Sequence, residues 1–66
     1  MYIIYFVSKE NENNKGYFQK MATTGFWSTI YKSQATQFSD ETKAKKQLEE
    51  LKEKEGQWYD FLIEKI

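Results

Sequence analysis

The chain has 66 residues, with ten lysines against ten acidic residues, and the resulting zero net charge argues against generic electrostatic binding to nucleic acid or to an anionic membrane. It contains neither cysteine nor histidine, which excludes disulfides and thiolate metal sites and removes the commonest general base. Aromatic residues form 18% of the sequence, so they must supply most of the core of one small domain spanning residues 1–66.

Two strands joined by a loop are expected at the beginning of the chain. Tyr2–Val7 is β-branched and aromatic throughout, which favours a central strand. Glu10–Gly16 is polar and asparagine-rich, so it predicts a hairpin loop, and Tyr17–Met21 predicts the returning strand. The first run is too short to cross a bilayer and has no signal-peptide pattern. We therefore expect a cytoplasmic protein with no membrane segment.

The middle of the chain gives weaker periodic signals. Gly25 predicts a bend or bulge before the apolar pair Phe26 and Trp27. Within Ser28–Phe38, aromatic and alanine residues recur at helical spacing, but serines and threonines interrupt them. This segment therefore predicts an irregular turn or a single helical turn, whose aromatic side chains pack beneath the following helix.

A helix is expected between Ser39 and Gly56. Ser39 is a favourable N-cap, acidic residues occupy the first turn, and Gly56 follows lysines in the last turns. The apolar positions Ala44, Leu48 and Leu51 form one narrow stripe, and most other positions are lysine or glutamate. A stripe of this width can cover only one face of a sheet.

The last segment, Gln57–Ile66, predicts a strand that is apolar on both faces. Its odd-numbered and even-numbered positions point in opposite directions, and both sets are apolar: Tyr59, Phe61 and Ile63 on one side, and Trp58, Leu62 and Ile66 on the other. Because the helix covers only one face, the other must be covered by a loop, a second copy or a partner. This excess of apolar strand surface indicates a binding function.

Together these elements predict an α+β fold. We expect a three-stranded sheet, formed by a β-hairpin and the C-terminal strand, with one main α-helix packed on one face. A strand that follows a helix commonly returns beside the first strand, and it runs parallel to that strand if the helix makes a crossover connection.

The titratable residues do not predict an enzyme. Asp60, which lies within the apolar last strand, is the only candidate catalytic group, and an edge position or a lysine partner accounts for it better. We therefore expect a non-enzymatic protein with no cofactor and no metal site.

Three segments carry a recognisable pattern. Gly25–Ser28 gives a glycine-aromatic turn, Ala35–Ser39 gives an Ala-x-x-Phe-Ser step, and Ala44–Leu51 lies in a helix that reads Ala-x-x-x-Leu-x-x-Leu. In this pattern the chain resembles small ββαβ proteins encoded by bacteriophages and prophages of low-GC Gram-positive bacteria. The resemblance implies a phage accessory protein acting in the cytoplasm of the host cell. Some small phage proteins of this size bind and inhibit host factors.

The expected function is binding of a host protein through aromatic and lysine residues that the helix leaves uncovered. These candidate contact residues are Tyr5, Tyr17, Lys20, Trp27, Tyr31 and Trp58. Trp27 alternatively closes the bottom of the core.

Two other functions would use the same surface. Single-stranded nucleic acid could stack its bases on the rings, although the balanced charge and the absence of arginine make it the less favoured partner. A homodimer could instead bury Trp58, Leu62 and Ile66 between symmetry mates.

Overall fold

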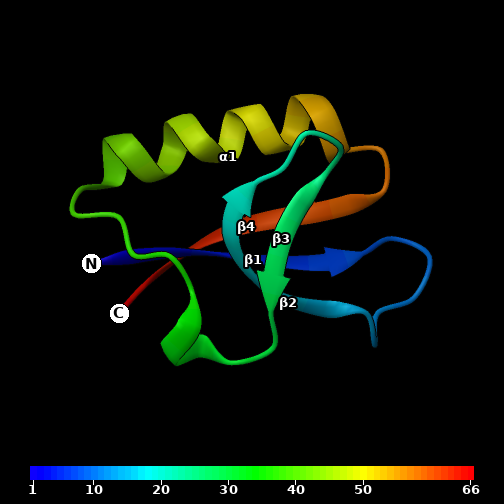
Figure 1. Ribbon diagram of the computed structural model, residues 1–66, viewed down its shortest axis with the longest axis horizontal. Coiled ribbons are helices and arrows are strands. Elements are labelled where there is room, and N and C mark those ends of the chain that lie inside the picture. The colour runs from blue at the N-terminus through cyan, green and yellow to red at the C-terminus, as the bar shows by residue number, and fades with distance from the viewer.

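The computed structural model describes residues 1–66 as four strands, one short 3₁₀ helix and one α-helix (Figure 1). In chain order the elements are β1 (Tyr2–Ser8), β2 (Lys15–Met21), β3 (Phe26–Thr29), η1 (Lys32–Gln34), α1 (Glu41–Glu55) and β4 (Tyr59–Lys65). The α+β class expected from the sequence is confirmed.

The sheet has four strands in the order β3-β2-β1-β4, and every pair is antiparallel. The expectation of three strands is wrong because Phe26–Thr29 pairs with β2 as an edge strand. Gly25, with a φ of 85°, closes a tight turn in which the Ala22 N–H donates to the Gly25 carbonyl at 3.1 Å. Only glycine adopts this left-handed conformation at little cost, so Gly25 makes a hairpin where the sequence predicted a bend.

The last strand lies beside the first, as expected, but β4 runs antiparallel to β1. The reason is the path of residues 30–40, which carry the chain back to the start of β1 before α1 begins. There the backbone groups of Tyr2 and Phe38 exchange two hydrogen bonds, of 3.0 and 2.8 Å. The helix then runs in the direction of β1, so the strand after it must return the opposite way.

The sheet is strongly curled. The pairing of β2 with β3 shifts register between Phe18 and Lys20, which leaves Gln19 as an extra residue in β2. Such a bulge bends a strand and increases its twist, and Figure 1 shows β2 and β3 turning up toward the C-terminal end of α1. Phe26 on one edge strand therefore reaches across the core to Phe61 on the other, with a ring separation of 5.6 Å.

The core lies between α1 and the concave face of the sheet. It consists of Ile4, Phe6, Phe18, Leu51 and Phe61, all with 4% or less of their surface exposed. The narrow stripe on the helix is confirmed, because Ala44 and Leu51 are buried and Leu48 is half-buried against the same cluster.

The ends of α1 differ slightly from the prediction. Asp40, and not Ser39, is the N-cap, and its carboxylate accepts a hydrogen bond from the Lys43 N–H at 2.8 Å. Gly56 closes the helix in the right-handed conformation, with a φ of −65°, and its N–H donates to the Lys52 carbonyl. The left-handed freedom of glycine is therefore not used at this position.

A loop covers part of the second sheet face. Residues 30–37, which include η1, pass on the side opposite α1 (Figure 1). Thr36 N–H donates to the Phe18 carbonyl at 3.1 Å, and the Gln19 side-chain amide donates to the Gln34 carbonyl at 3.1 Å. Ile3, which alternates away from the core cluster, is completely buried at this end of the sheet. The remaining part of the face is not covered by this loop.

Candidate partner-binding surface

The large apolar side chains that remain exposed fall into two groups at the two edges of the sheet. They are Met1, Trp27, Ile30, Tyr31, Trp58, Leu62 and Ile66. Three of them belong to β3 and the turn after it, and the other four belong to β4 and its immediate neighbours. Met1 is in the second group because its carbonyl accepts a hydrogen bond from the Ile66 N–H at 2.9 Å.

The first group, with one adjacent lysine, forms what we call the β3 surface: Lys20, Trp27, Ile30 and Tyr31. Trp27 and Tyr31 are each 59% exposed and Ile30 is 73% exposed. Lys20 is paired with Trp27 in the sheet, and its ammonium group lies 5.9 Å from the centre of the indole ring, within cation–π range. Trp27 therefore faces outward and does not close the core.

The segment that carries the β3 surface is held by a connected set of hydrogen bonds. The Thr29 hydroxyl donates to the Gln34 side-chain carbonyl and accepts from the Tyr31 N–H, both at 3.1 Å. The Gln34 N–H donates back to the Tyr31 carbonyl at 3.0 Å. The Thr36 hydroxyl also donates to the Gln19 carbonyl of β2. These bonds fix the backbone on both sides of Ile30 and Tyr31.

An ion pair also fastens this segment to the far edge of the sheet. Lys32 of η1 lies 2.9 Å from the Glu64 carboxylate of β4. The hydrogen bond to Glu64 raises the pKa of Lys32 above the ordinary lysine value of 10.5. A raised pKa means that protonation of Lys32 contributes to stability in full below the ordinary lysine pKa, and that this contribution is lost as the pH rises through the pKa of the folded state.

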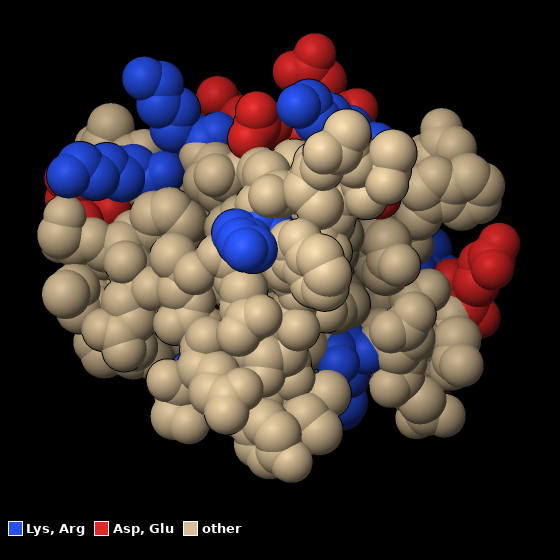
Figure 2. Space-filling view, in the orientation of Figure 1, with Lys and Arg blue, Asp and Glu red and all other residues tan.

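Figure 2 shows how charge is distributed on the side of the molecule where β3 lies in front. Lysine and acidic side chains gather along α1, and the surface below the helix is mostly uncharged, with isolated lysines and one acidic group at the right-hand edge of the view. The face of α1 that is turned away from the sheet carries the ion pairs Glu41–Lys45 and Glu50–Lys54, at 3.1 and 3.5 Å. The charged side chains on this side of the molecule are therefore concentrated along α1.

Two of the expected contact residues lie between the edges. Tyr5 and Tyr17 are cross-strand partners on the face opposite α1, with ring centres 5.4 Å apart and planes at 56°. They continue a row across the sheet from Thr29 to Leu62. Both are half-buried. The structure thus pairs Tyr5 with Tyr17 and Lys20 with Trp27, and it leaves Trp58 at the opposite edge.

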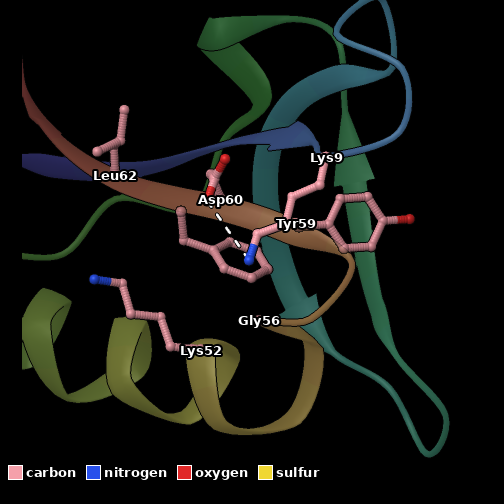
Figure 3. A pocket seen from close by; sticks show the side chains of 7 residues that line it. Lys9, Lys52, Gly56, Tyr59, Asp60 and Leu62 are labelled. Atoms are coloured by element: carbon pink, nitrogen blue, oxygen red, sulfur yellow. Dashed lines mark ion pairs between the residues drawn. The ribbon is translucent and has the colours of Figure 1, made fainter.

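A hollow of about 630 Å³ lies beside β4 near the C-terminal end of α1 (Figure 3). Its lining residues are Lys9, Lys52, Gly56, Tyr59, Asp60, Phe61 and Leu62. Asp60 pairs with Lys9 at a distance of 3.9 Å, and its side chain is 70% exposed. The carboxylate is therefore solvated and paired with a lysine, as expected for an edge position.

Sequence reasoning did not include Ile30 and Leu62 among the contact residues. Ile30 is the most exposed large apolar residue of the chain, but it lies in the irregular segment between β3 and η1, where no periodic pattern indicates its exposure. Leu62 was placed only in the alternative homodimer. The sequence does contain a signal for Leu62, because its alternation with Phe61 places it on the face of the last strand that the helix does not cover.

Other functional features are few. No three acidic side chains lie close enough together to hold a metal ion, and α1 is neither long nor apolar enough to cross a membrane. The chain matches no protein-family model, no curated protein and no solved structure.

Proposed function

We propose that this chain is a small non-enzymatic protein-binding module, and that the β3 surface contacts its partner. The observation that carries the proposal is the exposure of Trp27, Ile30 and Tyr31 within five consecutive residues. Aromatic side chains are enriched at the energetic centres of protein interfaces. Contiguous exposed apolar patches on small proteins are often functional.

The hydrogen-bonded frame of this segment supports the proposal. A flexible loop loses conformational freedom when it binds, and that loss reduces affinity. Here Thr29 and Gln34 already hold the backbone around Tyr31, and Lys32 ties η1 to β4. The β3 surface is therefore presented in a fixed shape before any partner arrives.

A protein partner is favoured over single-stranded nucleic acid. The net charge is zero and the chain has no arginine, so long-range attraction to phosphates is weak. Tyr5 and Tyr17 are half-buried and contact each other at a tilt, which limits the ring area available for stacking bases. Salt-tolerant binding is the expected behaviour.

The identity of the partner rests on the resemblance to small phage proteins. On that basis we propose a phage accessory protein that acts in the cytoplasm of a Gram-positive host and binds, and inhibits, a host protein. The resemblance assigns no residue to this role, so the contact residues come only from the exposed surface.

Affinity capture from a host lysate tests this function. We expect the tagged protein to retain one host protein after nuclease treatment and at high salt. The double variant Trp27→Ala/Tyr31→Ala should lose that protein, whereas the matched double variant Trp58→Ala/Leu62→Ala, at the other edge, should retain it. If nuclease treatment abolishes capture, the chain binds nucleic acid and not a protein. If the first double variant still captures the host protein, the β3 surface is not the contact surface.

A further inference from the structure

The outer edge of β4 is unpaired. The Lys9 N–H donates to the Trp58 carbonyl and the Ile66 N–H donates to the Met1 carbonyl, so the even-numbered residues of β4 direct their backbone groups toward β1. The odd-numbered residues, Tyr59, Phe61, Ile63 and Lys65, therefore direct theirs outward. No loop or strand of the chain hydrogen-bonds to them.

Several of the features that usually protect an edge strand are absent from β4, although the strand carries the charged residues Asp60, Glu64 and Lys65. Natural edges are commonly short, bulged, interrupted by proline or covered. β4 has seven residues, its pairing with β1 is continuous from Ser8↔Tyr59 to Tyr2↔Lys65, and the chain contains no proline. The opposite edge strand, β3, has only four residues and pairs with β2 across a bulge.

The exposed side chains of β4 are arranged symmetrically about Leu62. Trp58, Leu62 and Ile66 are spaced four residues apart, and they are 50%, 60% and 46% exposed. We call these three residues the β4 stripe. Asp60 and Glu64 lie between them, also at equal distances from Leu62.

We propose that β4 pairs antiparallel with β4 of a second copy of this chain, with the two-fold axis at Leu62. In this register the outward backbone groups of Tyr59 and Phe61 meet those of Lys65 and Ile63 of the second copy. Each such pair exchanges two hydrogen bonds. The result is a continuous eight-stranded antiparallel sheet with both helices on the same face.

The same register aligns the β4 stripe with itself. Leu62 is opposite Leu62 of the second copy, and Trp58 is opposite Ile66 of the second copy. These are non-hydrogen-bonded pairs, in which side chains on neighbouring strands approach most closely. Homodimer interfaces of this isologous kind require a self-complementary surface, which the spacing about Leu62 provides.

Neighbouring registers are less favourable. The outward groups are on odd-numbered residues, so the pairing can shift only in steps that keep odd residues opposite odd residues. Centring the axis on Phe61 places Leu62 opposite Asp60, and centring it on Ile63 places Leu62 opposite Glu64. Either shift sets an apolar side chain against a carboxylate, so Leu62 is the favoured centre.

Electrostatics permit this association. Asp60 and Glu64 of the two copies are opposite one another, which is unfavourable for bare carboxylates. Each is paired within its own chain, however, with Lys9 at 3.9 Å and with Lys32 at 2.9 Å. The zero net charge of the chain adds no overall repulsion. Figure 3 shows the hollow beside β4, between the strand and Lys52 of α1, on the side where the second copy approaches.

Molar mass in solution tests the dimer. Sedimentation equilibrium should give a dimer for the unaltered chain and a monomer for Leu62→Lys, which places two ammonium groups face to face. The matched variant Ile30→Lys, at an exposed apolar residue of the other edge, should remain dimeric. A monomer at every accessible concentration, or a dimer that Ile30→Lys dissolves and Leu62→Lys does not, would overturn the proposal.

Disulfide cross-linking tests the register. The chain has no cysteine, and the Cα atoms of a non-hydrogen-bonded pair are about 4.5 Å apart, a distance that a disulfide can span. Leu62→Cys should therefore form a covalent dimer readily under mild oxidation. Asp60→Cys is the matched control, because its two copies would be four positions apart along the strands, roughly 13 Å. Cross-linking at residue 60 that equals that at residue 62 would contradict the register.

These outcomes are independent of the proposed partner. Trp27→Ala/Tyr31→Ala should leave the mass dimeric even where it abolishes capture. If the unaltered chain is a monomer and Leu62→Lys abolishes capture, β4 is the partner-binding edge and the dimer is excluded.

Discussion

Trp27 is exposed and Leu51 is buried. Substituting each in turn therefore distinguishes a contact residue from a core residue. Leu51 of α1 is completely buried against Ile4, Phe6 and Phe61, whereas Trp27 is 59% exposed on β3. Removing a buried leucine side chain loses apolar burial and leaves a cavity. Removing an exposed ring loses little of either.

We therefore predict that Leu51→Ala lowers the free energy of unfolding by about 2–5 kcal/mol. Trp27→Ala should change it by only about 0.5 kcal/mol. Leu48→Ala should give an intermediate loss, because Leu48 is half-buried. Urea unfolding followed by far-ultraviolet circular dichroism measures all three without relying on tryptophan fluorescence. A loss for Trp27→Ala as large as that for Leu51→Ala would mean that Trp27 supports the fold and would weaken its role as a contact.

The candidate contact residues could be predicted from the sequence only in part. Aromatic and lysine residues outside the helix were selected, and Trp27, Tyr31, Trp58 and Lys20 are indeed exposed. Exposure depends on which neighbours pack across the sheet, and residue type does not encode it. Tyr5 and Tyr17 are half-buried for this reason, because each is packed against the other.

At the level of elements, the β2–β3 hairpin depends on the backbone of Gly25. Its φ of 85° lies in the left-handed region, and an added Cβ would meet only the Glu55 carboxylate, at an ordinary contact distance of 3.8 Å. A substitution there is therefore opposed by backbone strain and not by a collision.

Gly25→Ala should accordingly destabilise the protein by about 1–2 kcal/mol, the usual cost of a left-handed conformation for a residue with a Cβ. Gly25→Asn should cost less, because asparagine visits this conformation more readily. Thr24→Ala, at an exposed neighbour, should have little effect. Equal losses for alanine and asparagine in urea unfolding would contradict the assignment of the cost to φ.

The second strand of this hairpin, β3, is the element that the sequence did not predict. The helix, the first hairpin, the last strand and the α+β class follow from runs and periodicities that are long enough to recognise. β3 has four residues, of which Ser28 and Thr29 are polar, and its pairing with β2 is interrupted by the bulge at Gln19. Neither its length nor its composition distinguishes it from the irregular segment that follows. Long-range pairing with β2 decides its structure.

The direction of β4 was beyond prediction for a related reason. It depends on whether residues 30–40 return the chain to the start of β1, and the evidence for that return is the contact between Tyr2 and Phe38. Those residues are far apart in the sequence. Local patterns gave the neighbouring position of β1 and β4 but not their relative direction.

At the scale of the whole molecule, a chain of 66 residues has a small core and leaves apolar groups exposed at both edges of its sheet. A domain of this size buries only about 60% of the surface of its unfolded chain, so its stability alone is modest. Pairing at β4 would bring the two copies of the β4 stripe into side-by-side contact and satisfy the outward backbone groups of four residues. The folding and the association of the chain would then be linked.

Linkage gives a prediction that does not depend on identifying any partner. Because a dimer forms only from folded chains, the unfolding temperature of the unaltered protein should rise with protein concentration. The unfolding temperature of Leu62→Lys should not, since that variant has no second copy to bind, and at low concentration the two proteins should converge. Thermal unfolding by circular dichroism across a wide concentration range measures this. If the unfolding temperature of the unaltered protein does not depend on concentration, the chain is a monomer in which β4 is a free edge. The β3 surface would then be the only binding surface that we propose.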